Sequence, residues 1–234
     1  MSLPVINTPT YTLIVPSTDQ EITYRPFLVK EEKLLLIAQE TGGDEATYRA
    51  IRNIIEQCVL EKIDLDRMPL FDMEYIFLNI RAKSVGEVAK LKVKCPDDEK
   101  TEVEVEVDLT EVVVQMDEDH DARIQLTDEI GVLMNYPSLG TVGTMQKKGS
   151  NADSLFNMIC NCIYQIWQGE EVFDAMDYTL KDKMTFLESL NHQQFEKIQH
   201  FFETMPTLKH DIHVDNPKTK KKSTLTLEGM NAFF

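Results

Sequence analysis

Two neighbouring segments near the middle of the chain alternate strictly between apolar and charged residues. Val88–Lys94 reads Val-Ala-Lys-Leu-Lys-Val-Lys, and Glu102–Val107 reads Glu-Val-Glu-Val-Glu-Val. A period of two is typical of β-strands with one buried and one solvated face. An antiparallel hairpin closed over Cys95–Thr101 places the lysines opposite the glutamates, and opposite charges stabilise such cross-strand pairs. The pattern therefore predicts a small β unit in a chain whose other patterns are mostly helical.

The composition indicates a folded, strongly acidic chain. It has 234 residues, 42% of them hydrophobic, and a formal net charge of −16. This charge repels nucleic acid and anionic membranes and leaves basic protein surfaces as the favoured partners. The sequence has no apolar run of the roughly 18–20 residues that span a bilayer, and its first residues lead us to expect no signal peptide. Its four cysteines lack the spacing of a secreted disulfide framework. We therefore expect a soluble intracellular protein with reduced thiols.

The remaining patterns predict strands at both ends of the chain and helices between them. The expected strands are Thr8–Val15, Glu21–Phe27, Leu208–Val214 and Ser223–Leu227. The expected helices cover residues 30–40, 44–59, 71–85, 151–167, 179–190 and 191–205. The predicted fold class is α+β: a mostly helical body with an N-terminal β-hairpin, an inserted acidic antiparallel β unit and a C-terminal β-hairpin.

Four consecutive parts of one compact protein follow from these patterns. They are residues 1–85, the acidic β unit 86–137, a glycine-containing loop 138–150, and the helices and closing hairpin of 151–234. Because the loop has few large apolar residues, we expect it to be mobile or to become ordered against a partner. Gly140 and Gly143 are therefore candidate partner-binding residues.

An acidic segment after the hairpin holds the best candidate for a metal site. Asp117, Asp119 and Asp121 occupy the first, third and fifth positions of a calcium loop. However, Ala122 stands where the turn requires glycine, and Asp128 stands where a bidentate glutamate is usual. We expect an exposed acidic loop without a bound metal.

The residue patterns do not match the known motifs for zinc binding, hydrolysis or phosphate binding. Cys95-Pro96 begins like a zinc knuckle, but Asp97 and Asp98 occupy the positions where a second cysteine is required. The chain has no G-x-S-x-G, H-E-x-x-H or phosphate-loop motif. Its carboxylates are expected mostly on solvated faces. We therefore predict that the protein is not an enzyme and needs no cofactor; the weaker alternative is a metal-dependent hydrolase that uses Asp117, Asp119 and His120.

Two adjacent aromatic residues, Phe233 and Phe234, end the sequence. Either this tail folds back onto the body of the protein, or it anchors another subunit. Both residues are therefore candidate partner-binding residues.

Several runs together resemble the baseplate hub assembly proteins and hub subunits of T-even-type contractile-tailed bacteriophages, over nearly the whole chain. The runs are Ile22-Thr23-Tyr24-Arg25-Pro26-Phe27 before Glu31-Glu32-Lys33-Leu34-Leu35, Asp72-Met73-Glu74-Tyr75 before Arg81-Ala82-Lys83-Ser84-Val85-Gly86, the Cys95-Pro96 hairpin, Phe202-x-x-Met205-Pro206-x-Leu208-x-His210, and Leu227-Glu228-Gly229-x-x-x-Phe233-Phe234.

The resemblance implies a non-enzymatic protein that assembles or forms part of the baseplate hub. It implies no catalytic positions. The implied partners are other hub, spike or tape-measure proteins, with homo-oligomers also open. The implied locations are the host cytoplasm during assembly and the baseplate of the virion tail. A cytoplasmic adaptor or chaperone with no viral role remains the alternative.

Overall fold

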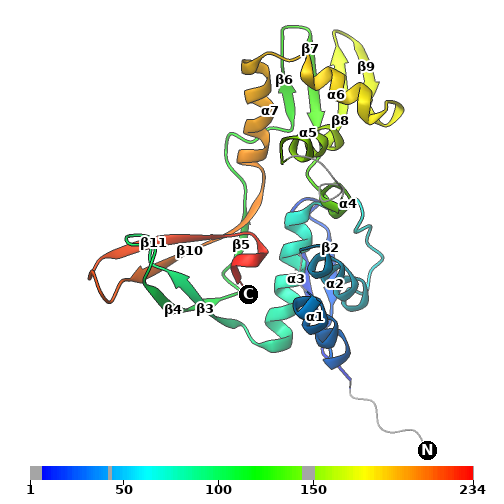
Figure 1. Ribbon diagram of the computed structural model, residues 1–234. Coiled ribbons are helices and arrows are strands. Elements are labelled where there is room, and N and C mark those ends of the chain that lie inside the picture. The colour runs from blue at the N-terminus through cyan, green and yellow to red at the C-terminus, as the bar shows by residue number, and fades with distance from the viewer. Residues whose placement is uncertain (1–6, 42–43, 144–150, 234) are drawn as a thin grey trace, which may run out of the picture. The chain divides into compact units, whose positions relative to one another are not determined.

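The computed structural model describes residues 7–41, 44–143 and 151–233, and it confirms the α+β class (Figure 1). The chain forms two compact units. Unit 1 contains the described residues of Met1–Asp64, Phe71–Gln115 and Thr207–Phe234, and unit 2 contains those of Leu65–Leu70 and Met116–Pro206. These units do not follow the four consecutive parts expected from the sequence, because the C-terminal hairpin joins the central β unit.

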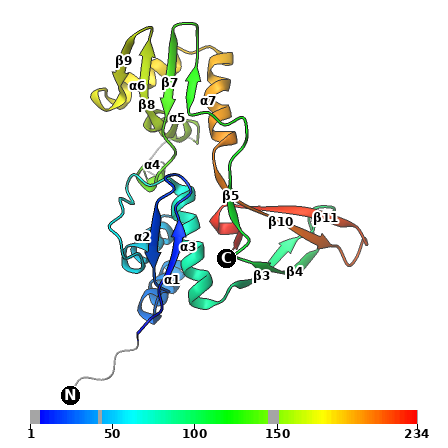
Figure 2. The same ribbon diagram turned by 180° about the vertical axis from the view of Figure 1, so that it is seen from behind.

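The N-terminal part of unit 1 combines a hairpin with three helices. Strands β1 (Tyr11–Ile14) and β2 (Glu21–Tyr24) pair antiparallel, which confirms the predicted N-terminal hairpin. The helices are α1 (Val29–Thr41), α2 (Asp44–Cys58) and α3 (Leu70–Val85). The hairpin lies beside α2 and α3 in both views (Figures 1 and 2).

Strands β3 (Val88–Lys94) and β4 (Glu102–Asp108) form the charge-matched hairpin in the predicted register. The opposed pairs are Lys90 with Glu106, Lys92 with Glu104, and Lys94 with Glu102. The lysines and glutamates are exposed, whereas Ala89, Leu91 and Val93 on the other face are buried. The alternation of charge and burial therefore sets this register.

A three-stranded sheet completes unit 1, in the order β11-β10-β5. Its strands are β5 (Val113–Gln115), β10 (Thr207–Asp215) and β11 (Lys222–Glu228), and the last two confirm the predicted closing hairpin. The 3-10 helix η2 (Met230–Phe233) follows. One apolar cluster joins these strands to the β3–β4 hairpin, α3 and η2. Its buried members are Leu78, Ala82, Ala89, Leu91, Val93, Cys95, Val107, Leu109, Val112, Leu208, Ile212, Val214, Leu227 and Phe233.

Unit 2 is built on an antiparallel sheet in the order β6-β7-β8-β9. The strands are β6 (Arg123–Gln125), β7 (Ile130–Met134), β8 (Ile163–Gln168) and β9 (Glu171–Asp174). The helical elements are α4 (Leu139–Gly143), α5 (Asn151–Cys162), η1 (Ala175–Asp177), α6 (Leu180–Glu188) and α7 (His192–Thr204). Capping boxes begin α6 at Thr179 and α7 at Asn191.

The two faces of this sheet differ in what covers them. Ile124, Val132 and Ile166 belong to an apolar cluster with buried residues of α5, α6 and α7. Because side chains alternate along a strand, Gly131 and Trp167 lie on the opposite face. The helices therefore pack on one face of the sheet.

Strand β8 corrects the predicted helix over residues 151–167. The helix ends at Cys162, and Ile163–Gln168 pairs with β7 and β9 instead. The segment is rich in β-branched and aromatic residues, and such residues favour a strand wherever neighbouring strands are available. The sequence pattern did not reveal those neighbours.

All four cysteines, Cys58, Cys95, Cys160 and Cys162, are free and buried. Burial raises the pKa of the Cys58 and Cys160 thiols to about 11, and that of Cys162 to about 12. These thiols are therefore protonated at neutral pH.

Candidate functional site

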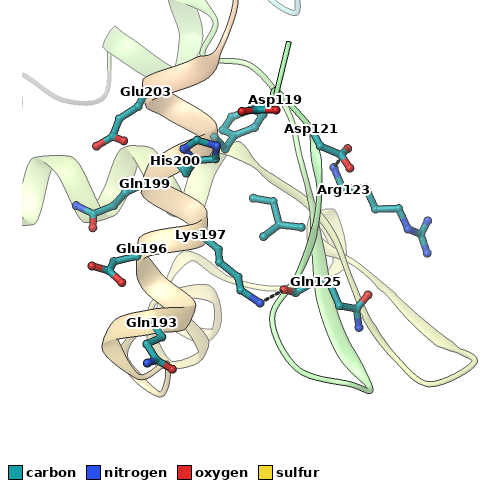
Figure 3. Close-up of a pocket in the computed structure, with 12 residues that line it drawn as sticks. Asp119, Asp121, Arg123, Gln125, Gln193, Glu196, Lys197, Gln199, His200 and Glu203 are labelled. Carbon is teal, nitrogen blue, oxygen red and sulfur yellow. Dashed lines mark hydrogen bonds between the residues drawn. The ribbon is translucent and has the colours of Figure 1, made fainter. Parts of the chain in front are cut away.

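A groove of about 630 Å³ lies between helix α7 and strand β6 at the edge of the unit 2 sheet (Figure 3). Its charged and polar lining residues are Asp119, Asp121, Arg123, Gln125, Gln193, Glu196, Lys197, Gln199, His200 and Glu203. In Figure 3, Lys197 points toward β6, whereas Glu196 and Glu203 point away from it. The groove is polar and carries both signs of charge.

The two cations of this groove are engaged within the fold. The Nζ atom of Lys197 donates a hydrogen bond of 2.7 Å to the main-chain oxygen of Gln125, and this bond joins α7 to β6. The guanidinium of Arg123 lies 4.3 Å from the ring centroid of Trp167, in cation–π geometry. Both positively charged side chains are therefore held in place by contacts within unit 2.

His120, a metal-ligand candidate from the sequence, has both ring nitrogens occupied. Its Nδ1 lies 3.0 Å from the hydroxyl of Thr204, and its Nε2 lies 3.0 Å from the hydroxyl of Tyr136. Because the Thr204 hydroxyl already donates to the carbonyl of His200, it accepts from Nδ1–H, and Nε2 accepts from Tyr136. Burial lowers the pKa of His120, which favours this neutral imidazole. The ring therefore ties the end of α7 to the chain beyond β7.

The acidic loop near His120 is organised by local turns. A carboxylate oxygen of Asp117 accepts from the amide of Asp119 at 3.2 Å, and one of Asp121 accepts from the amide of Arg123 at 2.8 Å. In the described ranges, no three His, Cys, Asp or Glu side chains gather in a group that could hold a metal ion.

The turn that begins with Cys95-Pro96 is joined to the turn of the β10–β11 hairpin. Asp97 accepts from the side-chain amide of Asn216 at 2.8 Å and from the hydroxyl of Thr219. Asp98 closes its own turn by accepting from the amide of Thr101 at 2.9 Å. These hydrogen bonds hold the pKa values of both aspartates below the ordinary value. Asp97 therefore links the turns of the two hairpins, and Asp98 stabilises the first of these turns.

The four residues predicted to bind a partner lie in different environments. Gly140 and Gly143 belong to helix α4, so the loop prediction is wrong for residues 139–143, and the rest of that loop lies outside the described residues. Gly140 is exposed. Phe233 is 0% exposed and packs in the unit 1 core. For Phe233 the tail thus folds back onto the body, while Phe234 lies outside the described residues.

Three carboxylates are buried among the described residues: Glu31, Asp72 and Glu74. Glu31 forms an ion pair of 2.9 Å with Arg25 and accepts from the amide of Leu28 at 2.8 Å. Although burial opposes it, the hydrogen bond from Arg25 keeps the pKa of Glu31 below its ordinary value. Glu31 thus acts as an N3 acid that accepts from the amide of the residue before α1, but Leu28 is not a usual N-cap residue, so the capping signature is absent from the sequence.

The other two buried acids are in the first turns of α3. Asp72 accepts from the amide of Ser17 at 3.1 Å and from the Ser17 hydroxyl, which fixes the β1–β2 turn to α3. Glu74 accepts from the amide of Met230, and burial raises its pKa to about 7. Both contacts join segments far apart in the sequence, so no local pattern predicts them.

These observations define the class: an acidic α+β protein of two units whose buried acids tie its own elements together. The chain belongs to the T4 bacteriophage base plate protein family, whose model matches residues 8–234. The family associates the chain with the phage tail baseplate. No curated protein and no solved structure matches it. Among the described residues, no helix is long and apolar enough to cross a membrane.

Proposed function

We propose that the protein is a non-enzymatic hub component, or hub-assembly factor, of the baseplate and that it acts through contacts with other baseplate proteins. One observation carries the proposal: the groups best suited to chemistry are bonded within the fold. Both nitrogens of His120 are engaged, Lys197 binds a main-chain oxygen, and Glu74 holds the amide of Met230. Its partners are other hub, spike or tape-measure proteins, met in the host cytoplasm during assembly.

The strongest argument for an enzymatic function instead comes from Glu74. A carboxyl with a pKa of about 7 has the value expected of a general acid or base. However, the side chain is buried, and its hydrogen bond fixes the C-terminal η2 segment of the same chain. A structural role explains the burial and the raised pKa together.

The charge of the chain supports contacts with basic protein surfaces. A net charge of −16 steers association toward positive partners and accelerates their encounter. The same charge disfavours nucleic acid as a partner.

Reconstruction of tail tips tests the proposal. Phage that lack this chain should produce tails or baseplates without a complete hub, and supplying the chain should restore it. A complete hub in its absence would contradict the proposal. As a test for chemistry, Glu74→Gln and Asp119→Asn should restore hubs as well as the natural chain does. A folded Glu74→Gln protein that fails to restore them would favour an enzymatic role.

A further inference from the structure

Strand β9 is an edge of the unit 2 sheet and pairs with β8 alone among the described strands. A two-residue loop, Gly169 and Glu170, joins β8 to β9, and Gly169 has a φ of +58°. In such a hairpin the residues beside the loop form a hydrogen-bonded pair, and bonded pairs then alternate. The main-chain groups of Phe173 therefore face β8, and those of Val172 point outward.

The opposite edge of the same sheet is blocked by its own side chains. On β6 the outward amide of Arg123 donates to Asp121, and the outward oxygen of Gln125 accepts from Lys197. Sequence Glu171–Asp174 carries neither a lysine nor a proline, two residues that protect edge strands. The two edges thus differ, and within the described part of the chain β9 is the edge open to a further strand.

Four exposed apolar side chains lie on β9 or in the segment that follows it. Val172 is 59% exposed and Met176 is 79% exposed, and Tyr178 and Leu180 are exposed as well. These four residues fall within one short stretch of chain that runs from β9 through η1 to the start of α6. Exposed apolar groups that gather in this way mark interaction surfaces.

A hollow of about 410 Å³ adjoins the edge on the helix side of the sheet. Its apolar lining residues are Ile130, Ile166, Phe173, Ala175, Tyr178 and Phe186. The ring of Tyr178 meets that of Phe173 edge-on, with the centroids 6.3 Å apart. A strand added beside β9 would place alternate side chains next to Phe173 and its hollow, and the others next to Val172.

The charge around the edge selects the partner. Five acids lie between residues 169 and 183, against two lysines: Glu170, Glu171, Asp174, Asp177 and Asp182 against Lys181 and Lys183. We propose that β9 and the exposed side chains of Val172, Met176, Tyr178 and Leu180 dock an extended segment of another baseplate protein, in which apolar side chains alternate with or are flanked by lysine and arginine. This inference rests on the proposed function, because it names the surface through which the protein contacts its neighbours.

Charge substitution on exposed positions tests the surface. Val172→Lys and Met176→Lys add positive charge that repels a basic segment, and the exposure of both positions preserves the fold. Met116→Lys is the matched control, because Met116 is 62% exposed in the same unit. Tagged full-length chain from infected cells should co-purify with other baseplate proteins. Both test variants should lower that recovery by about tenfold, whereas the control stays within about twofold.

The outcomes separate the two proposals. If the natural chain recovers no baseplate protein, the proposed function fails. If the natural chain and both test variants recover them equally, the β9 surface is overturned and the proposed function stands.

Photo-crosslinking identifies the occupant. A photoreactive phenylalanine at position 172 or 176 should crosslink to an extended, basic segment of a different baseplate protein, and one at position 116 should not. A crosslink to a second copy of this chain, or to a segment without basic residues, would overturn the inference. So would the lack of any crosslink in a preparation that still co-purifies with baseplate proteins.

Discussion

Trp167 lies directly opposite Gly131 in the pairing of β8 with β7, and its indole fills the space that a side chain at position 131 would need. A Cβ atom on Gly131 would overlap the indole and lie 2.6 Å from the main-chain oxygen of Ile124. Arg123 also stacks on the same indole. The absence of a side chain at position 131 thus allows a tryptophan to be buried on the sheet face that lies away from the helices.

Gly131→Ala should therefore lower the free energy of unfolding by about 1–3 kcal/mol, because the methyl group must displace the indole or the main chain. Urea unfolding followed by tryptophan fluorescence measures the change, since Trp167 is the only tryptophan. Gly140→Ala is the control. Its new Cβ atom would lie 3.7 Å from the main-chain oxygen of Asp66 and from the Ser138 hydroxyl, which is ordinary contact, and Gly140 lies in helix α4, where alanine is favoured over glycine. Equal effects of the two substitutions would contradict the close approach.

Glu74→Gln should change how stability depends on pH. The pKa rises from 4.5 to about 7 in the fold, so the folded state holds this proton more tightly than the unfolded chain. The stability linked to this proton is fully present below pH 4.5 and is lost as the pH rises through about 7. Glutamine keeps an acceptor for the Met230 amide without titrating. As the pH rises across this window, the natural chain should therefore lose stability relative to the Glu74→Gln variant, by on the order of 3 kcal/mol. A constant difference between pH 4 and pH 8 would contradict it.

Phe233→Ala should lower the free energy of unfolding by about 3–5 kcal/mol, because it empties a fully buried position in the unit 1 core. Phe233→Leu keeps most of the apolar volume and should cost less than half as much. Denaturant titration of the two variants makes the comparison. A Phe233→Ala protein as stable as the natural chain would show that the tail lies outside the core.

Glu104→Lys should destabilise the β3–β4 hairpin by about 0.2–1 kcal/mol, because it places a lysine opposite Lys92. The double variant Lys92→Glu with Glu104→Lys restores an opposite pair and should recover the loss. Thermal unfolding at low salt gives the largest effect, since added salt screens exposed charges. A double variant no more stable than Glu104→Lys alone would argue against this register.

The sequence predicts this hairpin well because its charges and its burial pattern agree. It also locates most helices and the closing hairpin from apolar periodicity, whereas the capping boxes at Thr179 and Asn191 come from the structure. It fails at Ile163–Gln168, where a strand follows a helix without a break in apolar residues. The deciding factor is the pairing with β7 and β9, which is a tertiary contact and leaves no local mark.

In the candidate site, too, local features can be predicted from the sequence and contacts between distant residues cannot. The aspartates of the acidic loop can be found by inspection, but the partners of His120 cannot, because Thr204 is 84 residues away along the chain. The same holds for Asp72 and Ser17, which are 55 residues apart. The open β9 edge was missed because the segment before it was assigned to a helix.

The burial of all four thiols has a practical consequence for site-specific labelling. In the native protein, Cys58, Cys95, Cys160 and Cys162 are shielded from maleimide reagents. A single cysteine engineered at an exposed position such as Met176 would therefore carry a fluorophore without removal of the native cysteines. A change in its emission would then report the binding of a partner segment beside strand β9.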